Sequence, residues 1–523
     1  MHHRHRRLLP AALALVLWGL SCHGGGGPPY HEVQEPRVTC LAPTLRSGGL
    51  NQAVDPGTTC LAPPRASALP AAGVEGPQGV VDLGPHAVGE VVTFDVPPGT
   101  ASLMLLEQLV SGGPANQQVT VTFTSDGSTM TGDNVAVIGE LHDPSGRLIY
   151  TDLEVIAATD ASAELLFAQG SGAVVGAASY PSTSAGLQAV ASGGVASGTW
   201  SVLVNDYAHE CWLAAQPDGP PGLTGPEGIS CPVASQANDA VYRLYALTTP
   251  AAAGGSPRAS ATLDVAFHLV DAPTPIIGID AAHAPTDPSV RRMVESFGWL
   301  LSGAGVCLGT VTFYDEPAWA RVRFATGTSA DGVGPCSNLS QLLATSVPGQ
   351  RTLELFLVPR LSGSSIGSSF VLGVDGTVPG PATVNGTIAS GAVVSAEDLG
   401  SGSCPAPGAP GQPRPEGCGS DLVAYIAAHE AGHYLGLYHP TEGDGSSFDP
   451  IADTPHCECS SHCGLSPATC KSNGLPATRC AGPDARCGGG PNLMFWLISQ
   501  VSAGYLSPDQ ANLVRSSPVL RSP

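Results

Sequence analysis

The strongest constraint on the fold of this chain is an eleven-residue stretch, HEAGHYLGLYH, that runs from His429 to His439. If the stretch begins in a helix, His429 and His433 lie on one face, and both imidazoles can reach one ion. Gly436 can end that helix with a positive φ and turn the chain, so that His439 reaches the same ion. The spacing therefore predicts a helix, a glycine turn and a three-histidine metal site.

The same stretch indicates a catalytic metal site and not a structural one. Three protein ligands leave an open position for water, which is the usual arrangement of catalytic zinc. The carboxylate of Glu430 can hydrogen-bond such a water without binding the ion, and can therefore act as a general base. Asp421 to Ala428 is expected to begin the helix, with Ser420 as its cap. A helix whose histidines only pack is the alternative.

These residues are the signature of the metzincin peptidases, and the chain resembles that clan over about 260 to 520. In this clan a methionine turn lies beneath the zinc, and Asn492–Trp496 is similar to it, with Met494 as the methionine. The order of Asp453-Thr454-Pro455, cysteines and Asn-x-Met is similar to the pappalysin family. The resemblance implies a zinc endopeptidase that cleaves a protein or peptide substrate, with a twisted sheet and an active-site helix.

The resemblance also implies two further roles. Related sequences often place a tyrosine two residues after the turn methionine, where its hydroxyl approaches the reacting carbonyl. Here that position is Trp496, whose indole N–H can donate a hydrogen bond but cannot replace a phenol. Calcium is implied in the loop after the third histidine, where oxygen ligands are supplied by Glu442, Asp444, Asp449 and Asp453. Solvated loop carboxylates are the alternative, and Asp453 can instead cap a turn.

The segment 1 to 22 is expected to be an export signal and not a folded element. A basic start, Met1 to Arg7, precedes an apolar run, Leu8 to Leu20, that is too short to span a bilayer. The run ends just before Cys22, which resembles the lipidated first residue of a bacterial lipoprotein. Cleavage followed by free secretion is the alternative. The chain is therefore predicted to be exported, either to the bacterial cell surface or to the extracellular space.

The charge of the chain limits which partners it can bind. The formal net charge is −22, and Lys471 is the only lysine. Nucleic acid is therefore not an expected partner, because nothing would neutralise its phosphates. A membrane is expected to hold the chain only through the lipid on Cys22. The oligomeric state is not indicated by the sequence.

The cysteine count agrees with an oxidising compartment, where disulfides persist. Fifteen cysteines without Cys22 leave an even number. Cys40 and Cys60 stand in two copies of Thr-Cys-Leu-Ala-Pro, which predicts a Cys40–Cys60 bridge. A cluster of six cysteines between 457 and 487 is expected to form disulfides, with a structural zinc site that uses Cys459 and Cys463 as the alternative.

The pattern of short segments divides the rest of the chain. Residues 23 to 80 are rich in Gly and Pro and are expected to be a tether. From 81 to 250, strands that alternate at period two, such as Val91–Val96 and Thr199–Val204, predict an all-β sandwich or jelly roll. This region is expected to be an accessory domain with a structural or docking role. The predicted fold is therefore multidomain, with an α/β metzincin-like domain at 258 to 523.

The last domain shows strand–helix–strand order, which favours a twisted sheet packed on helices. Asp287 and Pro288 predict a helix start. Strands are expected at 263–269, 308–314, 353–358 and 391–396. Gly391 to Ser395 is predicted to be an edge strand that binds an extended substrate by strand addition.

A second function from another class stays open. The chain can be a surface lipoprotein that binds a partner or mediates adhesion, with a metzincin-like domain that is catalytically weak or inactive. The presence of Glu430 favours the enzyme, because loss of that carboxylate is the simplest route to inactivity.

Overall fold

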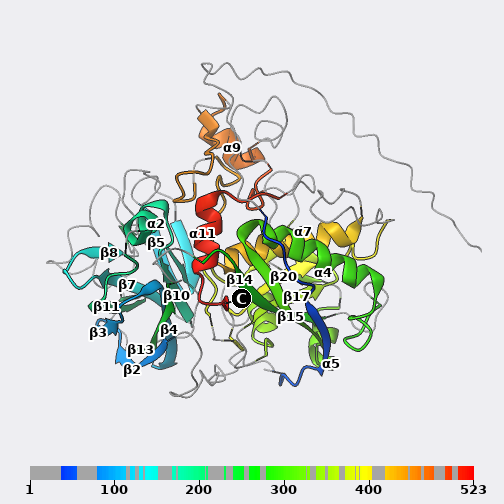
Figure 1. The fold of residues 1–523 in the computed structure, drawn as a ribbon, viewed down its shortest axis with the longest axis horizontal. Helices are drawn as coiled ribbons and strands as arrows, with labels where there is room; N and C mark the ends of the chain where they lie inside the picture. Colours follow the sequence, from blue (N-terminus) through cyan, green and yellow to red (C-terminus); the bar gives the residue numbers. More distant parts are fainter. Residues whose placement is uncertain are drawn as a thin grey trace, which may run out of the picture.

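The structure, a computed structural model, contains a β-rich region and an α/β region that lie side by side (Figure 1). It describes residues 37–55, 79–112, 118–123, 129–133, 136–150, 168–171, 175–191, 193–206, 208–209, 229–230, 239–251, 258–270, 278–325, 327–329, 337–347, 352–363, 371–382, 385–387, 389–402, 418–445, 448–460, 464–475, 489, 491–496 and 504–522. The predicted export signal with Cys22 lies outside these ranges. Within them, no helix is both long and apolar enough to cross a membrane.

A six-stranded sheet forms the centre of the α/β region. Its strands follow in the order β1 (Thr44–Leu50), β15 (Val306–Asp315), β14 (Ala261–Leu269), β17 (Leu353–Val358), β20 (Ala392–Ser395) and β19 (Gly373–Asp375). Neighbouring strands are parallel except for β19, which runs antiparallel to β20. The strands predicted at 263–269, 308–314, 353–358 and 391–396 are therefore confirmed.

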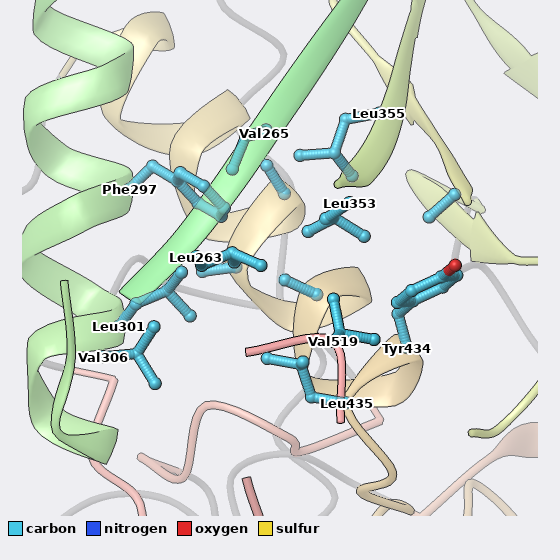
Figure 2. Packing of buried hydrophobic residues seen from close by; sticks show 14 of the residues in the cluster. Leu263, Val265, Phe297, Leu301, Val306, Leu353, Leu355, Tyr434, Leu435 and Val519 are labelled. Atoms are coloured by element: carbon cyan, nitrogen blue, oxygen red, sulfur yellow. The ribbon is translucent and has the colours of Figure 1, made fainter. Parts of the chain in front are cut away.

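Helices cover both faces of this sheet. They are α4 (Pro288–Leu301) and α7 (Gly419–Tyr434) on one face, and α5 (Ala318–Arg323) and α6 (Asn338–Leu343) on the other. Side chains of β17 alternate between the two cores, with Leu355 in the first and Phe356 in the second. Figure 2 shows the first core, in which Phe297 of α4 lies beside Val265 of β14, and Tyr434 lies on the other side of the cluster at the end of α7. Every residue of β17 is buried, as is typical of a parallel sheet that is covered on both sides.

The start of α7 differs from the prediction. Its N-cap is Cys418, and Ser420 lies in the first turn, so the prediction of Ser420 as the cap is wrong. Asp421, in the same turn, accepts two hydrogen bonds of 2.8 Å from Arg292 of α4. Because both side chains are buried, this bidentate ion pair holds the two helices at one relative position.

Two antiparallel sheets pack face to face in the β-rich region, which confirms the predicted sandwich. The five-stranded sheet has the order β2 (Gly79–Ala87), β13 (Val241–Pro250), β4 (Thr100–Ser111), β10 (Val175–Tyr180) and β9 (Ala168–Ser171). The four-stranded sheet has the order β3 (Val91–Val96), β11 (Gly198–Asp206), β7 (Ala136–His142) and β8 (Leu148–Tyr150). Trp200 of β11 and Leu105 of β4 lie in the core between them. A small third sheet contains β12 (Ile229–Ser230), β5 (Gln118–Phe123) and β6 (Thr129–Asp133).

The five-stranded sheet is shared by the two regions. Met104 and Leu106 of β4 point away from the sandwich core and belong to the main core of the α/β region. Helix α11 (Pro508–Ser516) lies between the two regions (Figure 1). The hydroxyl of Ser102 donates a hydrogen bond of 2.6 Å to the carbonyl of Ser516 at the end of this helix. One continuous core therefore joins the sandwich to the α/β sheet.

The stretch at 37–55 is part of the fold, so the prediction of a tether over 23 to 80 is wrong there. It forms β1 at the edge of the six-stranded sheet, parallel to β15. The guanidinium of Arg37 lies 3.5 Å from the ring centre of Trp299 and donates to its carbonyl. Cys40 is bonded to Cys307, so the predicted Cys40–Cys60 bridge is wrong. The reason is that β-pairing brings Cys40 beside β15, and the repeat in the sequence carries no information about this contact.

The cysteine cluster forms disulfides, as predicted. Cys459 is bonded to Cys470 in α9 (Pro467–Asn473), and Cys457 is also disulfide-bonded. Cys459 is therefore not a zinc ligand, because a disulfide sulfur carries no thiolate. Cys463 lies outside the described residues.

Peptide mapping of the unreduced protein should recover a fragment that links Cys40 to Cys307. The two Cα atoms lie 5.3 Å apart, within the normal range for a disulfide. Cys459–Cys470 is an internal control, since it closes a short loop in another part of the chain. Reduction before digestion should separate both pairs. A fragment that links Cys40 to Cys60 would contradict the assignment.

A fully buried charge cluster lies on the sheet. The imidazole of His268 on β14 is 2.6 Å from a carboxylate oxygen of Glu316 and 2.5 Å from one of Glu354. Asn51 donates to the same oxygen of Glu316 at 2.8 Å. Burial alone lowers the pKa of His268, but the hydrogen bonds to Glu316 and Glu354 outweigh it and raise the pKa to about 9. His268 is therefore an imidazolium at neutral pH, and its charge offsets part of the charge of two buried carboxylates.

Raising the pH should weaken the fold, because folded His268 holds its proton more tightly than the unfolded chain does. This stabilisation is complete below the ordinary pKa of 6.5 and is lost as the pH rises through about 9. It amounts to roughly 3 kcal/mol in the free energy of unfolding. Urea unfolding across this range measures it in Glu430→Gln, because the raised pKa of Glu430, about 8, lies in the same range. The control His283→Gln, which removes an exposed histidine, should lose stability with rising pH as the unchanged protein does. A free energy of unfolding that stays constant between these pH values would contradict the charge assigned to His268.

Candidate metal centre

Three histidines converge at the C-terminal end of α7. His429 and His433 lie one turn apart on the helix, which ends at Tyr434. Gly436 has a φ of 106° and turns the chain, so that His439 comes back to the helix. The three Nε2 atoms are 3.1, 3.1 and 3.2 Å from one another. Among the described residues, this is the one group of three or more His, Cys, Asp or Glu side chains that could hold a metal ion.

Each imidazole is oriented through its other ring nitrogen. The Nδ1 of His429 lies 2.7 Å from the carbonyl oxygen of Leu493, and that of His433 lies 2.7 Å from the carbonyl oxygen of Leu437. A carbonyl oxygen can only accept, so each Nδ1 carries the proton and each Nε2 presents a lone pair. Zinc–imidazole bonds are about 2.0–2.1 Å long, so one ion can reach three nitrogens at this spacing. The residues therefore fit a metal ion.

Burial keeps two of the imidazoles in the form that binds a metal. Removal from water, together with the neighbouring His439, lowers the pKa of His429 to about 3. Burial likewise lowers the pKa of His433 well below its ordinary value. Neutral imidazole is the ligand form, so protons do not compete strongly for these two nitrogens near neutral pH.

Glu430 places a carboxylate beside the triad. Its side chain is buried, and burial raises its pKa to about 8. A Cβ added to Gly373 of β19 would overlap the Oε1 atom of Glu430, so the strand backbone lies directly against this carboxylate. Burial and the charge of Glu430 also raise the pKa of Asp375 on the same strand. Glu430 is thus located between the helix and the edge of the sheet.

The edge of the sheet is not the predicted one. Gly391 to Ser395 was expected at the edge, but β20 pairs with β17 on one side and β19 on the other. At this end of the sheet the edge strand is β19, Gly373–Asp375, which the sequence pattern did not indicate because it has only three residues. Among the described residues β19 pairs with a strand on one side only, so this edge belongs to the strand that touches Glu430.

Met494 packs against α7 beneath the histidines. A Cβ added to Gly432 would overlap the sulfur of Met494, so this sulfur lies on the helix backbone next to His433. The side chain of Asn492 accepts a hydrogen bond of 2.8 Å from the backbone N–H of Met494 and closes a tight turn. The carbonyl of Leu493, within this turn, is the acceptor for His429. The turn at Met494 therefore contacts His429 through a hydrogen bond and packs on the helix backbone next to His433.

Trp496 packs with the cysteine cluster. Its ring centre lies 6.2 Å from that of Phe495, and both rings contact the core formed by Cys457, Cys459, Cys470 and Leu475. Its buried indole N–H has no hydrogen-bond partner among the described residues. A role of this N–H in substrate binding stays a prediction.

The four side chains predicted to bind calcium have other partners or lie apart. Asp453 accepts hydrogen bonds from Ser507 (2.5 Å) and from the backbone of Asp509 (2.9 Å), at the start of α11. Asp449 accepts from Thr454 at 2.5 Å. Among the described residues, no three of Glu442, Asp444, Asp449 and Asp453 form a group that could hold an ion. Asp453 therefore binds the start of α11, a contact that neither of its two predicted roles included.

Glu442 has a role that the sequence did not suggest. Both of its carboxylate oxygens lie 3.0 Å from Nδ1 of His439. A carboxylate behind a metal-binding histidine orients the ring and makes its free nitrogen a stronger donor to the metal. Its position three residues after His439 is a signal that could have identified it.

Replacement of Glu442 by alanine should weaken metal binding, because His439 loses the group that orients it. We expect the dissociation constant for Zn²⁺ to rise about 10- to 100-fold. Competition with a chromophoric chelator measures the change. Glu90→Ala is the matched control, since it breaks a similar glutamate–histidine contact with His86 on the surface of the sandwich. Equal zinc affinity in Glu442→Ala and the unchanged protein would rule out this role.

No protein-family model matches the chain, and no curated protein matches it. The centre is therefore defined by its own geometry. It consists of three imidazoles whose Nε2 atoms converge, two backbone carbonyls and one carboxylate that orient them, and the buried carboxylate of Glu430.

Proposed function

We propose that this chain is an exported zinc-dependent endopeptidase, of the metzincin type that its motif resembles. The observation that carries the proposal is the position of Glu430, which is buried beside three converging histidines and against the edge strand of a sheet. A site that only stored a metal would need neither the carboxylate nor the edge. Export, with a lipid on Cys22 or with free release, belongs to the proposal because the disulfides fit an oxidising compartment.

Zinc is the metal that best suits this ligand set. Imidazole ligands suit Zn, Cu, Fe and Ni, and three histidines that leave a position open are typical of catalytic zinc. When bound, the ion would lower the pKa of a water molecule to about 7 and polarise the carbonyl of the substrate. His429, His433 and His439 would hold it.

Glu430 is the residue that carries the proton from the attacking water to the departing amine. As general base, its carboxylate takes a proton from the water that attacks the scissile carbonyl carbon. A C–O bond forms in this step, and the C–N bond then breaks as Glu430 returns the proton to the departing amine. Burial raises the pKa of Glu430, and a cation bound beside it would oppose this shift and favour the carboxylate that acts as base.

The edge strand β19 is the proposed binding site for the substrate backbone. An extended peptide can add to such an edge through main-chain hydrogen bonds, and the pockets beside it then select side chains. Because Gly373 lies against Glu430, a peptide paired with β19 would pass directly by the proposed base. A protein or peptide substrate in extended form is therefore the proposed substrate class.

Glu430→Gln should abolish cleavage of a mixed-peptide library while the protein still binds one zinc ion. The amide cannot accept the proton, and loss of a general base costs about 10²- to 10⁴-fold in turnover. Mass spectrometry of the products, with and without a zinc chelator, measures cleavage, and elemental analysis measures zinc. Glu397→Gln is the matched control, because Glu397 is exposed and pairs with Arg360 at the surface.

Two outcomes would contradict the proposal. Normal cleavage by Glu430→Gln would exclude this residue as the base. Zinc binding without cleavage by the unchanged protein would instead favour a surface protein that binds a partner through this domain.

A further inference from the structure

We propose that Asn492 and Gln510 are positioning residues, which hold the carbonyl of Leu493 on His429 and thereby set the affinity and geometry of the metal centre. The inference rests on the metal site of the proposed function and not on hydrolysis. It assigns a role to a buried amide pair that lies between the metal centre and the β-rich region.

Asn492 determines the shape of the turn. Its side chain is fully buried, and its Oδ1 accepts from the backbone N–H of Met494 at 2.8 Å. On the other side, the backbone N–H of Leu493 donates to Tyr505 at 2.9 Å. With both contacts in place, the carbonyl of Leu493 points at Nδ1 of His429, 2.7 Å away. A change in the turn would therefore move a group in direct contact with a metal ligand.

Gln510 determines which way the amide of Asn492 points. The Nδ2 of Asn492 donates to Oε1 of Gln510 at 2.8 Å. The same oxygen accepts from the backbone N–H of Ser507 at 3.0 Å, in the capping box of α11. An amide has one donor end and one acceptor end, so this contact directs Oδ1 toward Met494. Without Gln510, the amide of Asn492 would be free to turn over and lose the bond that closes the turn.

Helix α11 is itself held from both regions. The backbone N–H of Asp509 donates to Asp453 at 2.9 Å, and Ser184 of the β-rich region donates to the carboxylate of Asp509. Ser184 also accepts from the backbone of Ala452 at 2.9 Å. The position of Gln510 therefore depends on contacts with the sandwich, which connects that region to the metal centre.

Three variants separate positioning from ordinary stabilisation. Gln510→Met keeps the length of the side chain but removes the acceptor, whereas Gln510→Glu keeps an acceptor for both donors. Ser337→Ala removes a side-chain cap from the start of α6, on the other face of the sheet. Each protein is titrated with Zn²⁺ against a chelator and, loaded with Co²⁺, is examined by visible absorption, which reports ligand geometry. Thermal unfolding of the metal-free proteins gives stability separately.

For Gln510→Met we expect zinc binding about 10- to 100-fold weaker and an altered Co²⁺ spectrum. For Gln510→Glu we expect an affinity and a spectrum close to those of the unchanged protein. Ser337→Ala should unfold at a lower temperature with unchanged metal binding. If Gln510→Met does not fold, Asn492→Leu decides by the same two readouts, because it keeps the size of the side chain and removes the acceptor that closes the turn. We expect the same weaker zinc binding and altered spectrum for it.

A folded Gln510→Met protein with unchanged zinc affinity and an unchanged Co²⁺ spectrum would overturn the inference. That result differs from failure of the proposed function, which would appear as normal cleavage by Glu430→Gln or as an unchanged protein that binds zinc and cleaves no peptide.

Discussion

Helix α7 carries two histidines and a glutamate into the interior, where a polar group without a partner costs about 1–3 kcal/mol. Its other buried residues are mostly small or apolar and pack against α4 and the sheet. Each polar side chain is accommodated by a different contact. Carbonyls of Leu493 and Leu437 accept from the histidines, while Glu430 lies against β19 with a raised pKa. Burial of this helix therefore determines the arrangement of the whole centre.

The same burial explains why the two regions form one body. The face of the six-stranded sheet that carries α7 is completed by side chains from the sandwich, such as Met104 and Leu247. Figure 2 shows Val519, from the end of the chain, beside Leu435 at the end of α7. The core around α7 is thus built from segments at opposite ends of the sequence. Damage to the sandwich is expected to reach the metal centre through this core and through α11.

Much of the fold could be predicted because its signals are local. Asp287 caps α4 through the N–H groups of Ser289 and Val290, as its place before a proline suggested. Val91–Val96 alternates exposed and buried residues along β3, which the period of two predicted. The three histidines were found for the same reason, since a helix and one glycine turn suffice to bring them together.

The errors arose where a contact depends on distant segments. Cys40 pairs with Cys307, 267 positions away, because β1 joins β15, and no local pattern records such a pairing. The edge strand was assigned to 391–395 because β19 is too short to show periodicity. The contact of Glu442 with His439 was not predicted either, because the resemblance indicated only a calcium ligand at this position.

The three histidines with their spacing, Glu430 and the order of strands and helices along the chain follow from local sequence, because they depend on residues within one or two turns of each other. The strand at the edge, the cysteine that meets Cys40 and the groups that orient each imidazole follow only from the packing of the folded chain. Those features depend on how distant segments pack into a shared core. Such packing is set by the burial of all of them together and not by any one segment.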